Sequence, residues 1–228
     1  METALAEEIS HAPVRLPRIG VFGGTFDPPH VGHLIITTEL RFALSLDRVL
    51  FVPAGRPPHK AGQIVGDDAH RLAMLRLALV DAPEFEVSTV DLERHGPSYT
   101  ADTLGLLQDR LGPAELVFLM GEDSLRDLPT WHEPNLIATR AGFGVARRPG
   151  VVVDLDLVFS AVPAARGRVH LVDVPEIDIS SRDLRRRVAN GQPIRFQVPR
   201  PVEEYIRDRR LYLETAPPEH AHERQATV

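Results

Sequence analysis

Short apolar runs alternate with segments of helical periodicity through most of this sequence, and this alternation restricts the fold more than any other feature. Apolar and β-branched residues dominate six runs that predict strands, at 18–22, 48–52, 85–90, 115–120, 143–147 and 168–172. Apolar residues recur at helical spacing in five segments that predict helices, at 31–44, 68–80, 100–111, 182–190 and 201–212. Because strands separated by helices pair in parallel, we predict an α/β fold with a Rossmann-like open, mainly parallel sheet and helices on both faces. Such sheets bind ligands outside the carboxyl ends of their strands, so functional residues are expected there.

The composition is that of an ordinary globular protein, with 43% hydrophobic and 25% charged residues among 228. We predict a single domain over 15–214, flanked by polar, disordered tails at 1–14 and 215–228. The formal net charge of −6 argues against a dedicated nucleic-acid binder, which usually has a basic footprint. The absence of cysteine excludes disulfides and thiolate metal sites. We expect a cytoplasmic protein, because no run approaches the ~18 apolar residues of a membrane helix and the first residues do not resemble a signal peptide.

The segment GGTFDPPHVGH, residues 23–33, joins the first predicted strand to the first predicted helix. Gly23 and Gly24 leave no side chain between the strand end and a ligand. His30 and His33 are three residues apart, so both project from the same face of the first helical turn. Free N–H groups and the positive end of the helix dipole lie there too. The segment predicts an anion site with added imidazole donors, and it matches neither a Walker A loop nor the dinucleotide-binding glycine pattern.

A second anion site is predicted at DISSRDLRRRVANGQPI, residues 178–194. Ser180 or Ser181 can cap a helix that Gly191 ends. Guanidinium groups match phosphate oxygens, and the helix carries four of them, on Arg182, Arg185, Arg186 and Arg187. A capped surface helix with a solvated basic face is the simpler alternative for this segment.

The segment FLMGEDSLRDLPTWHEPNL, residues 118–136, contains a predicted strand end at Gly121. Asp123 can cap a following helix. Trp131 is the only tryptophan of the chain and follows a Pro-Thr break near the strand end, although a tryptophan more often belongs to the core. The segment predicts a strand, a turn and a cap, with Trp131 as a candidate stacking residue.

Two other segments carry candidate binding residues next to predicted elements. In GPSYTADTL, residues 96–104, Ser98 or Thr100 can cap the helix that follows. In GRPPHK, residues 55–60, a proline-rich loop after the second strand carries Lys60. Taken alone, the first is a capping turn and the second an ordinary loop.

GGTFDPPHVGH resembles the signature of the nucleotidyltransferases whose H-x-G-H is similar to the HIGH sequence of class I aminoacyl-tRNA synthetases. More narrowly, the chain resembles the bacterial nicotinate-nucleotide adenylyltransferases from about residue 18 to 213, through all five segments quoted above. The resemblance implies a nucleotidyltransferase-type sheet. It also implies an enzyme of NAD biosynthesis that joins ATP and nicotinate mononucleotide into deamido-NAD and releases pyrophosphate.

The resemblance further implies the site residues. It makes His30, His33 and Arg185 catalytic. For ATP it implies Gly23, Gly24, Thr25, Phe26, His30, His33, Gly121, Asp123, Ser180, Ser181 and Arg185. For nicotinate mononucleotide it implies Lys60, Tyr99, Thr100 and Trp131.

Each of these residues has an implied task. Gly121 and Asp123 would meet the adenosine ribose, and Trp131 would stack on the pyridine ring. Tyr99 and Thr100 would lie near the nicotinate carboxylate, and Lys60 near the phosphates.

The second anion site resembles the family's I-S-S-T-x-I-R motif, which holds the ATP triphosphate. Ser180, Ser181 and Arg185 match that motif, and Leu184 replaces isoleucine conservatively. Arg182 stands where threonine is usual, so it either adds a phosphate contact or points to solvent.

The reaction explains why no catalytic carboxylate pair or activated serine is evident. Its nucleophile is a phosphate with a second pKa near ~6, which is ionised at neutral pH and needs no general base. Two highly charged reactants must instead be held in line and their charge offset. We expect His30, His33, Lys60, Arg185 and two helix N-termini to do this, with Mg²⁺ bound through the ATP phosphates and not by a protein site.

Three alternatives remain at this point. One is another nucleotidyltransferase, such as phosphopantetheine adenylyltransferase, against which the Trp131 and GPSYTADTL segments argue. The second is a non-catalytic nucleotide-binding module, which would be marked by loss of a histidine or of the Ser-Ser-Arg set. The third is a tRNA-synthetase fragment, which a short acidic chain does not favour. The expected partners are the two small substrates, without nucleic acid or membrane, and the sequence leaves a homo-oligomer open.

Overall fold

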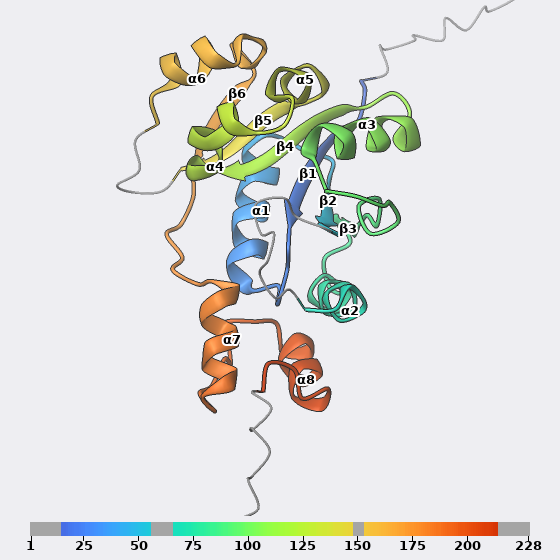
Figure 1. Cartoon of the computed structure of the whole chain (residues 1–228), viewed down its shortest axis with the longest axis vertical. Helices are drawn as coiled ribbons and strands as arrows, with labels where there is room; N and C mark the ends of the chain where they lie inside the picture. Colours follow the sequence, from blue (N-terminus) through green and yellow to red (C-terminus); the bar gives the residue numbers. More distant parts are fainter. Residues whose placement is uncertain (1–14, 56–65, 148–152, 214–228) are drawn as a thin grey trace, which may run out of the picture.

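The computed structural model describes residues 15–55, 66–147 and 153–213, so both predicted tails lie outside the described residues. Six parallel strands form one sheet in this part of the chain (Figure 1). They are β1 (Arg18–Gly24), β2 (Arg48–Pro53), β3 (Phe85–Val87), β4 (Glu115–Gly121), β5 (Gly142–Arg147) and β6 (Val169–Asp173). All six strands were predicted, and the parallel α/β fold class is confirmed.

Eight α-helices accompany the strands in the described part of the chain. They are α1 (Val31–Ala43), α2 (Asp68–Ala78), α3 (Thr100–Leu111), α4 (Glu122–Asp127), α5 (Pro134–Arg140), α6 (Leu155–Ala161), α7 (Ser181–Ala189) and α8 (Arg200–Asp208). The five predicted helices correspond to α1, α2, α3, α7 and α8. The sequence missed α5 and α6 and gave α4 only as a helix after Asp123 without bounds, because six or seven residues are too few to establish a helical repeat.

Two predicted elements end earlier than expected. The predicted strand 85–90 stops at Val87, and the predicted helix 201–212 stops at Asp208. After α8, Arg210 and Tyr212 have φ angles of 53° and 61°, a left-handed conformation that a helix cannot contain. The chain therefore turns back toward the body of the protein after α8.

The strand order β3-β2-β1-β4-β5-β6 has its reversal point between β1 and β4. From β1 the chain builds outward through β2 and β3, and it then crosses to the other side of β1 to build β4, β5 and β6. A crevice forms at such a point, outside the carboxyl ends of the central strands. β1 ends there at Gly24 and β4 ends there at Gly121.

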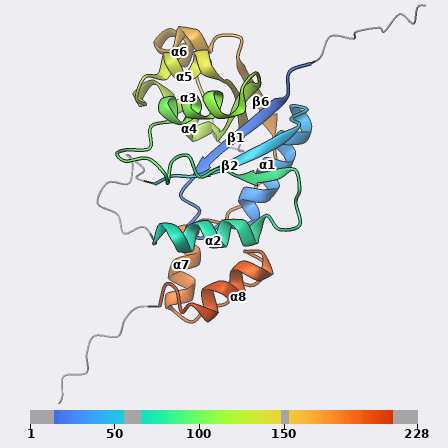
Figure 2. The same ribbon diagram turned by 90° about the vertical axis from the view of Figure 1, so that its right-hand side faces the viewer.

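The buried apolar residues form three clusters, which explain the layers of Figures 1 and 2. One cluster joins a face of the sheet to α3 and α5, and the second joins the other face to α1 and α2. The third lies between α2, α7 and α8 and contains Met74, Leu184, Val202 and Ile206. Helix α2 therefore packs against the sheet on one side and against the C-terminal helices on the other (Figure 2).

Among the described helices, none has the length and apolar content that a bilayer crossing requires.

Candidate active site

The turn after β1 is shaped by a buried aromatic ring. Phe26 has a φ of 51° and is 1% exposed, and its ring folds back toward the strand end. A Cβ atom at Gly24 would lie 2.8 Å from Cζ of that ring, so the position requires glycine. The Phe26 ring lies 5.2 Å from the His33 ring, edge to face, and supports it from the core side.

The two predicted histidines stand together at the start of α1. His30 is the N-cap residue, and its ring stacks on His33 with centroids 3.6 Å apart. The His30 backbone N–H donates to His33 Nδ1 at 3.1 Å, which fixes the second ring. A Cβ atom at Gly32 would lie 3.1 Å from His30 Nδ1, so the glycine between the histidines makes room for the first ring.

His30 is neutral at physiological pH in the free protein. His30 is 7% exposed, and burial lowers the pKa of its imidazole to about 4. Within the described part of the chain its Nδ1 is buried without a hydrogen-bond partner. His30 therefore offers a neutral polar group to a ligand, whereas the sequence predicted that it would supply positive charge.

Helix α7 is tied directly to the turn that carries the histidines. Ser180 Oγ accepts from the Asp183 N–H at 3.2 Å, which makes Ser180 the N-cap. Ser181 Oγ donates to the Pro28 carbonyl at 2.8 Å. Arg185 Nη1 donates to the Asp27 carbonyl at 2.6 Å. Two helix N-termini that are 150 residues apart in the sequence are thus held side by side.

A cavity of about 480 Å³ opens between these two helix N-termini. Most of the predicted phosphate-binding residues line it, namely His30, His33, Ser180, Ser181 and Arg185, together with Gly121 at the end of β4. Arg182 lines it as well, so this arginine brings a further guanidinium group to the cavity. The polar lining and the two helix dipoles suit a polyphosphate.

Three residues expected at the ATP site have other positions. The Phe26 side chain belongs to the core, and the Thr25 carbonyl accepts from Arg71 Nη1 at 2.8 Å. Asp123 does not cap α4, because the helix begins at Glu122 with Gly121 as N-cap. The Asp123 carboxylate instead lies 3.4 Å from Arg126 Nη1. In the described residues, the side chains of these three residues line neither of the two cavities at the strand ends.

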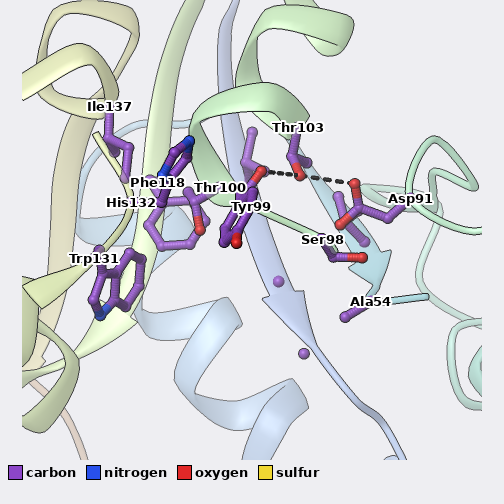
Figure 3. Close-up of a pocket in the computed structure, with 14 residues that line it drawn as sticks. Ala54, Asp91, Ser98, Tyr99, Thr100, Thr103, Phe118, Trp131, His132 and Ile137 are labelled. Carbon is purple, nitrogen blue, oxygen red and sulfur yellow. Dashed lines mark hydrogen bonds between the residues drawn. The ribbon is translucent and has the colours of Figure 1, made fainter. Parts of the chain in front are cut away.

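A second, smaller cavity of about 180 Å³ lies on the other side of the β1 end (Figure 3). Gly23 and Gly24 line it, so they belong to this cavity and not to the larger one. Trp131 also lines it and packs edge to face against Phe118, with centroids 5.9 Å apart. Trp131 thereby combines the core position and the ligand-facing position that the sequence left as alternatives.

The start of α3 provides the polar end of this smaller cavity. Tyr99 is the N-cap and Thr100 the first helical residue, and both line the cavity. The prediction that the Ser98 or Thr100 side chain caps the helix is wrong, because the N-cap makes no side-chain hydrogen bond. Backbone N–H groups at a helix start suit a carboxylate ligand. The Tyr99 ring packs 4.2 Å from that of His132, a lining residue without any signal in the sequence.

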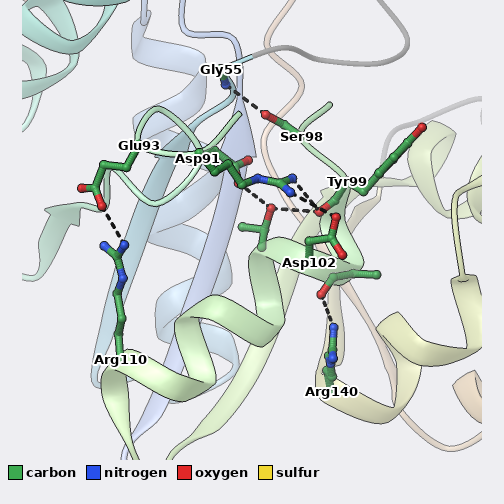
Figure 4. A network of polar contacts seen from close by, with 11 residues as sticks. Gly55, Asp91, Glu93, Ser98, Tyr99, Asp102, Arg110 and Arg140 are labelled. Atoms are coloured by element: carbon green, nitrogen blue, oxygen red, sulfur yellow. Dashed lines mark hydrogen bonds and ion pairs between the residues drawn. The ribbon is translucent and has the colours of Figure 1, made fainter. Parts of the chain in front are cut away.

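A polar network behind α3 fixes the cavity wall (Figure 4). Thr103 Oγ1 lies 2.7 Å from Asp91 Oδ1 and 3.0 Å from the Tyr99 carbonyl, and Arg94 Nε donates to the same Asp91 oxygen at 3.2 Å. Ser98 Oγ accepts from the Gly55 N–H at 3.1 Å, which joins the wall to the end of β2. Asp91 is 6% exposed, and burial raises the pKa of its carboxyl while hydrogen bonds from Thr103 and Arg94 oppose the rise.

Arg71, like Asp91, holds loops next to the cavities and was not predicted from the sequence. It is 0% exposed, and its guanidinium donates to the carbonyls of Thr25, Ala54 and Gly66 at 2.8, 2.7 and 3.1 Å. It also pairs with Asp68 at 2.5 Å. Arg71 thus joins the loops that leave β1 and β2 to the start of α2.

Lys60, expected near the phosphates, lies outside the described residues.

Comparisons with known proteins identify the family of this chain. Residues 21–187 match the family described as cytidylyltransferase-like. A relative in Thermomicrobium roseum, described as a probable nicotinate-nucleotide adenylyltransferase, is 60% identical over 86% of this chain and 92% of its own length. The chain belongs to the nicotinate-nucleotide adenylyltransferases, within the cytidylyltransferase-like family. A second adenylyltransferase so described, from Roseiflexus sp., is 50% identical over 85% of this chain and 97% of the relative.

Solved structures show the same fold at low identity. The Plasmodium falciparum nicotinic acid mononucleotide adenylyltransferase complexed with NaAD has a TM-score of 0.67. It is 19% identical, with 86% of this chain and 97% of that one covered. The same adenylyltransferase complexed with APC gives a TM-score of 0.68. These likenesses concern the fold, which agrees with the predicted nucleotidyltransferase type.

Proposed function

We propose that this chain transfers the adenylyl group of ATP to nicotinate mononucleotide, giving deamido-NAD and pyrophosphate. The observation that carries the proposal is the pair of adjoining cavities at the end of β1. One is polar and lies between two helix N-termini, and the other contains Trp131 and the start of α3. A dinucleotide product needs both kinds of surface, one for its phosphates and one for its pyridine ring.

The triphosphate of ATP occupies the larger cavity in this proposal. Arg185 and the N-termini of α1 and α7 offset its charge, and the His30 and His33 rings donate hydrogen bonds. Arg182, which replaces the usual threonine, adds to the positive potential. The adenosine ribose lies near Gly121, and the expected contacts of Thr25, Phe26 and Asp123 with ATP stay predictions.

Nicotinate mononucleotide occupies the smaller cavity in this proposal. Its pyridine ring stacks on Trp131, and its carboxylate accepts from the N–H groups at the start of α3, at Tyr99 and Thr100. An amide in place of the carboxylate could accept through its carbonyl oxygen, but its NH₂ group would face the same N–H donors and would need an acceptor. The uncapped start of α3 therefore favours nicotinate over nicotinamide.

The chemical step is an in-line displacement that needs little covalent help from the protein. A phosphate oxygen of the mononucleotide attacks the α-phosphorus of ATP and forms a new P–O bond. The bond to the bridging oxygen breaks, and pyrophosphate leaves with its electron pair. Because the nucleophile is already ionised at neutral pH, alignment and charge stabilisation supply the catalysis.

Mg²⁺ belongs to the substrate in this proposal. Among the described residues, no group of three or more His, Asp or Glu side chains is placed to hold a metal ion. Magnesium bound to the ATP phosphates would offset charge on the departing pyrophosphate. A cytoplasmic location stays a prediction, and a homo-oligomer stays open.

One assay tests the function directly. The purified protein is mixed with ATP and Mg²⁺, and nicotinate mononucleotide, nicotinamide mononucleotide and phosphopantetheine are offered in separate reactions. We expect fast pyrophosphate release and deamido-NAD with the first and much slower release with the other two. Faster turnover of phosphopantetheine, or none of nicotinate mononucleotide, would contradict the proposal.

A further inference from the structure

Tyr212, near the end of the described chain, reaches the turn that carries the catalytic histidines. We infer that its hydroxyl is a positioning group for adenylyl transfer: it holds Asp27, and Asp27 fixes the turn between β1 and α1. The inference rests on the function proposed above. It concerns a residue outside all the segments that the sequence assigns to substrate binding.

Asp27 is a buried acidic residue on which separate parts of the chain converge. It is 2% exposed. Its Oδ2 accepts from the Gly66 N–H at 2.9 Å, and its Oδ1 accepts from the Tyr212 hydroxyl at 2.6 Å. Arg185 Nη1 lies 3.8 Å from Oδ2 and donates to the Asp27 main-chain carbonyl. Asp27 thus connects the start of α2, helix α7 and the C-terminal segment to one turn.

The approach of Gly66 shows how closely this arrangement is packed. A Cβ atom at Gly66 would lie 2.7 Å from Asp27 Oδ1, so no other residue fits there without displacing the carboxylate. Arg71 holds the Gly66 carbonyl at 3.1 Å from its Nε. The donors around Asp27 therefore come from backbone and side chains that are themselves held in place.

Tyr212 is built to be a hydrogen-bond donor. Burial raises the pKa of its phenol, and the negative charge of Asp27 raises it further, so the hydroxyl keeps its proton. Its aromatic ring packs against the apolar cluster between α2, α7 and α8. The left-handed backbone at Arg210 and Tyr212 turns the chain so that the hydroxyl reaches Asp27. The Tyr212 ring therefore packs among the C-terminal helices, whereas its hydroxyl contacts the turn between β1 and α1.

The consequence for the reaction follows from the position of Asp27 in the chain. Two residues, Pro28 and Pro29, separate Asp27 from the N-cap His30, and Ser181 donates a hydrogen bond to the carbonyl of Pro28. Loss of the Tyr212 hydroxyl would leave a buried carboxylate oxygen without its phenol donor. The turn would then shift relative to α7, and the two helix N-termini that bind the triphosphate would lose their alignment.

The test compares Tyr212→Phe with a matched variant, Tyr205→Phe. The Tyr205 hydroxyl lies 2.9 Å from His70 Nδ1 and joins α8 to α2, away from the active-site turn. We expect Tyr212→Phe to lower kcat at least about tenfold, the scale of a hydrogen bond to a charged group. Tyr205→Phe should stay within about twofold of the wild type. In the Asp27→Ala background, adding Tyr212→Phe should lower kcat less than about threefold.

Hydrogen exchange gives a readout that does not require turnover. Backbone amides in peptides covering residues 25–34 should exchange faster in Tyr212→Phe than in the wild type. In Tyr205→Phe their exchange rates should equal those of the wild type. The inference would be overturned if the two variants lost kcat equally, or if amide exchange at residues 25–34 were unchanged in Tyr212→Phe. It would also be overturned if kcat of Tyr212→Phe fell only at temperatures at which the variant unfolds. A wild type without adenylyl transfer would contradict the proposed function instead, and the exchange experiment would still decide the role of Tyr212.

Discussion

At the scale of single residues, the pKa of His30 sets a pH dependence of stability. Its folded value of about 4 lies below its ordinary 6.5, so the unfolded chain takes up the proton at higher pH. The stabilising contribution of the neutral imidazole is therefore complete above about pH 6.5 and is lost as the pH falls toward about 4. This is the direction expected when a buried histidine must stay uncharged.

We predict that between pH 7 and pH 5 the wild type loses about 2 kcal/mol more unfolding free energy than His30→Gln, whose side chain does not titrate. Denaturant unfolding at the two pH values measures the difference. His170→Gln serves as the control, because the His170 side chain is exposed in the folded protein. Between pH 7 and pH 5 this variant should lose as much unfolding free energy as the wild type. A wild type and a His30→Gln variant with the same loss would show that His30 is not buried in its neutral form.

Trp131 leads to a second prediction at the residue scale. Trp131→Ala removes the stacking surface of the smaller cavity, and stacking of a base on an aromatic ring is worth ~1–3 kcal/mol. KM for nicotinate mononucleotide should rise by about 10- to 100-fold, whereas KM for ATP should change by less than about threefold. Steady-state kinetics with each substrate varied in turn provide the measurement. Equal increases for both substrates would remove Trp131 from the pyridine site.

At the scale of elements, the sequence predicted each strand of the described residues and the five helices of nine or more residues that the structure describes. Helix α4 was expected only as a helix after Asp123, and the short helices α5 and α6 were missed, although α6 had a local signal. Asp154 accepts from the N–H groups of Asp156 and Leu157, a side-chain cap that its residue type could have suggested. Tertiary contacts, and not periodicity, determine such short helices.

The candidate site follows the same division between local and distant information. The two helix starts that line the larger cavity were predictable because each carries its polar side chains within a few residues. Asp27, Arg71 and Tyr212 were not, since each has partners in distant parts of the chain. Tyr212 and Asp27 are separated by 185 positions, and no spacing rule connects them. Sequence therefore predicts the groups that meet substrate better than the groups that hold them in place.

At the scale of the whole molecule, the position of α7 at the larger cavity depends on the apolar cluster between α2, α7 and α8. Leu184 is 0% exposed and lies on the same helix as Ser181 and Arg185, packed against Met74 of α2. Ile206 of α8 is 3% exposed and belongs to the same cluster, but its helix carries no residue of the larger cavity among those described. Variants at Leu184 and Ile206 can therefore distinguish an effect on overall stability from an effect on the position of α7.

We predict that Leu184→Ala and Ile206→Ala each cost about 2–5 kcal/mol of unfolding free energy, because each leaves a cavity in the same cluster. Only Leu184→Ala should also raise KM for ATP, by about tenfold, since it lets α7 shift relative to the turn at Asp27 and Pro28. Denaturant unfolding and ATP kinetics below the unfolding transition measure both effects. If the two variants raise KM for ATP equally, the cluster supports the site only through overall stability, and the docking of α7 has no separate part in binding the triphosphate.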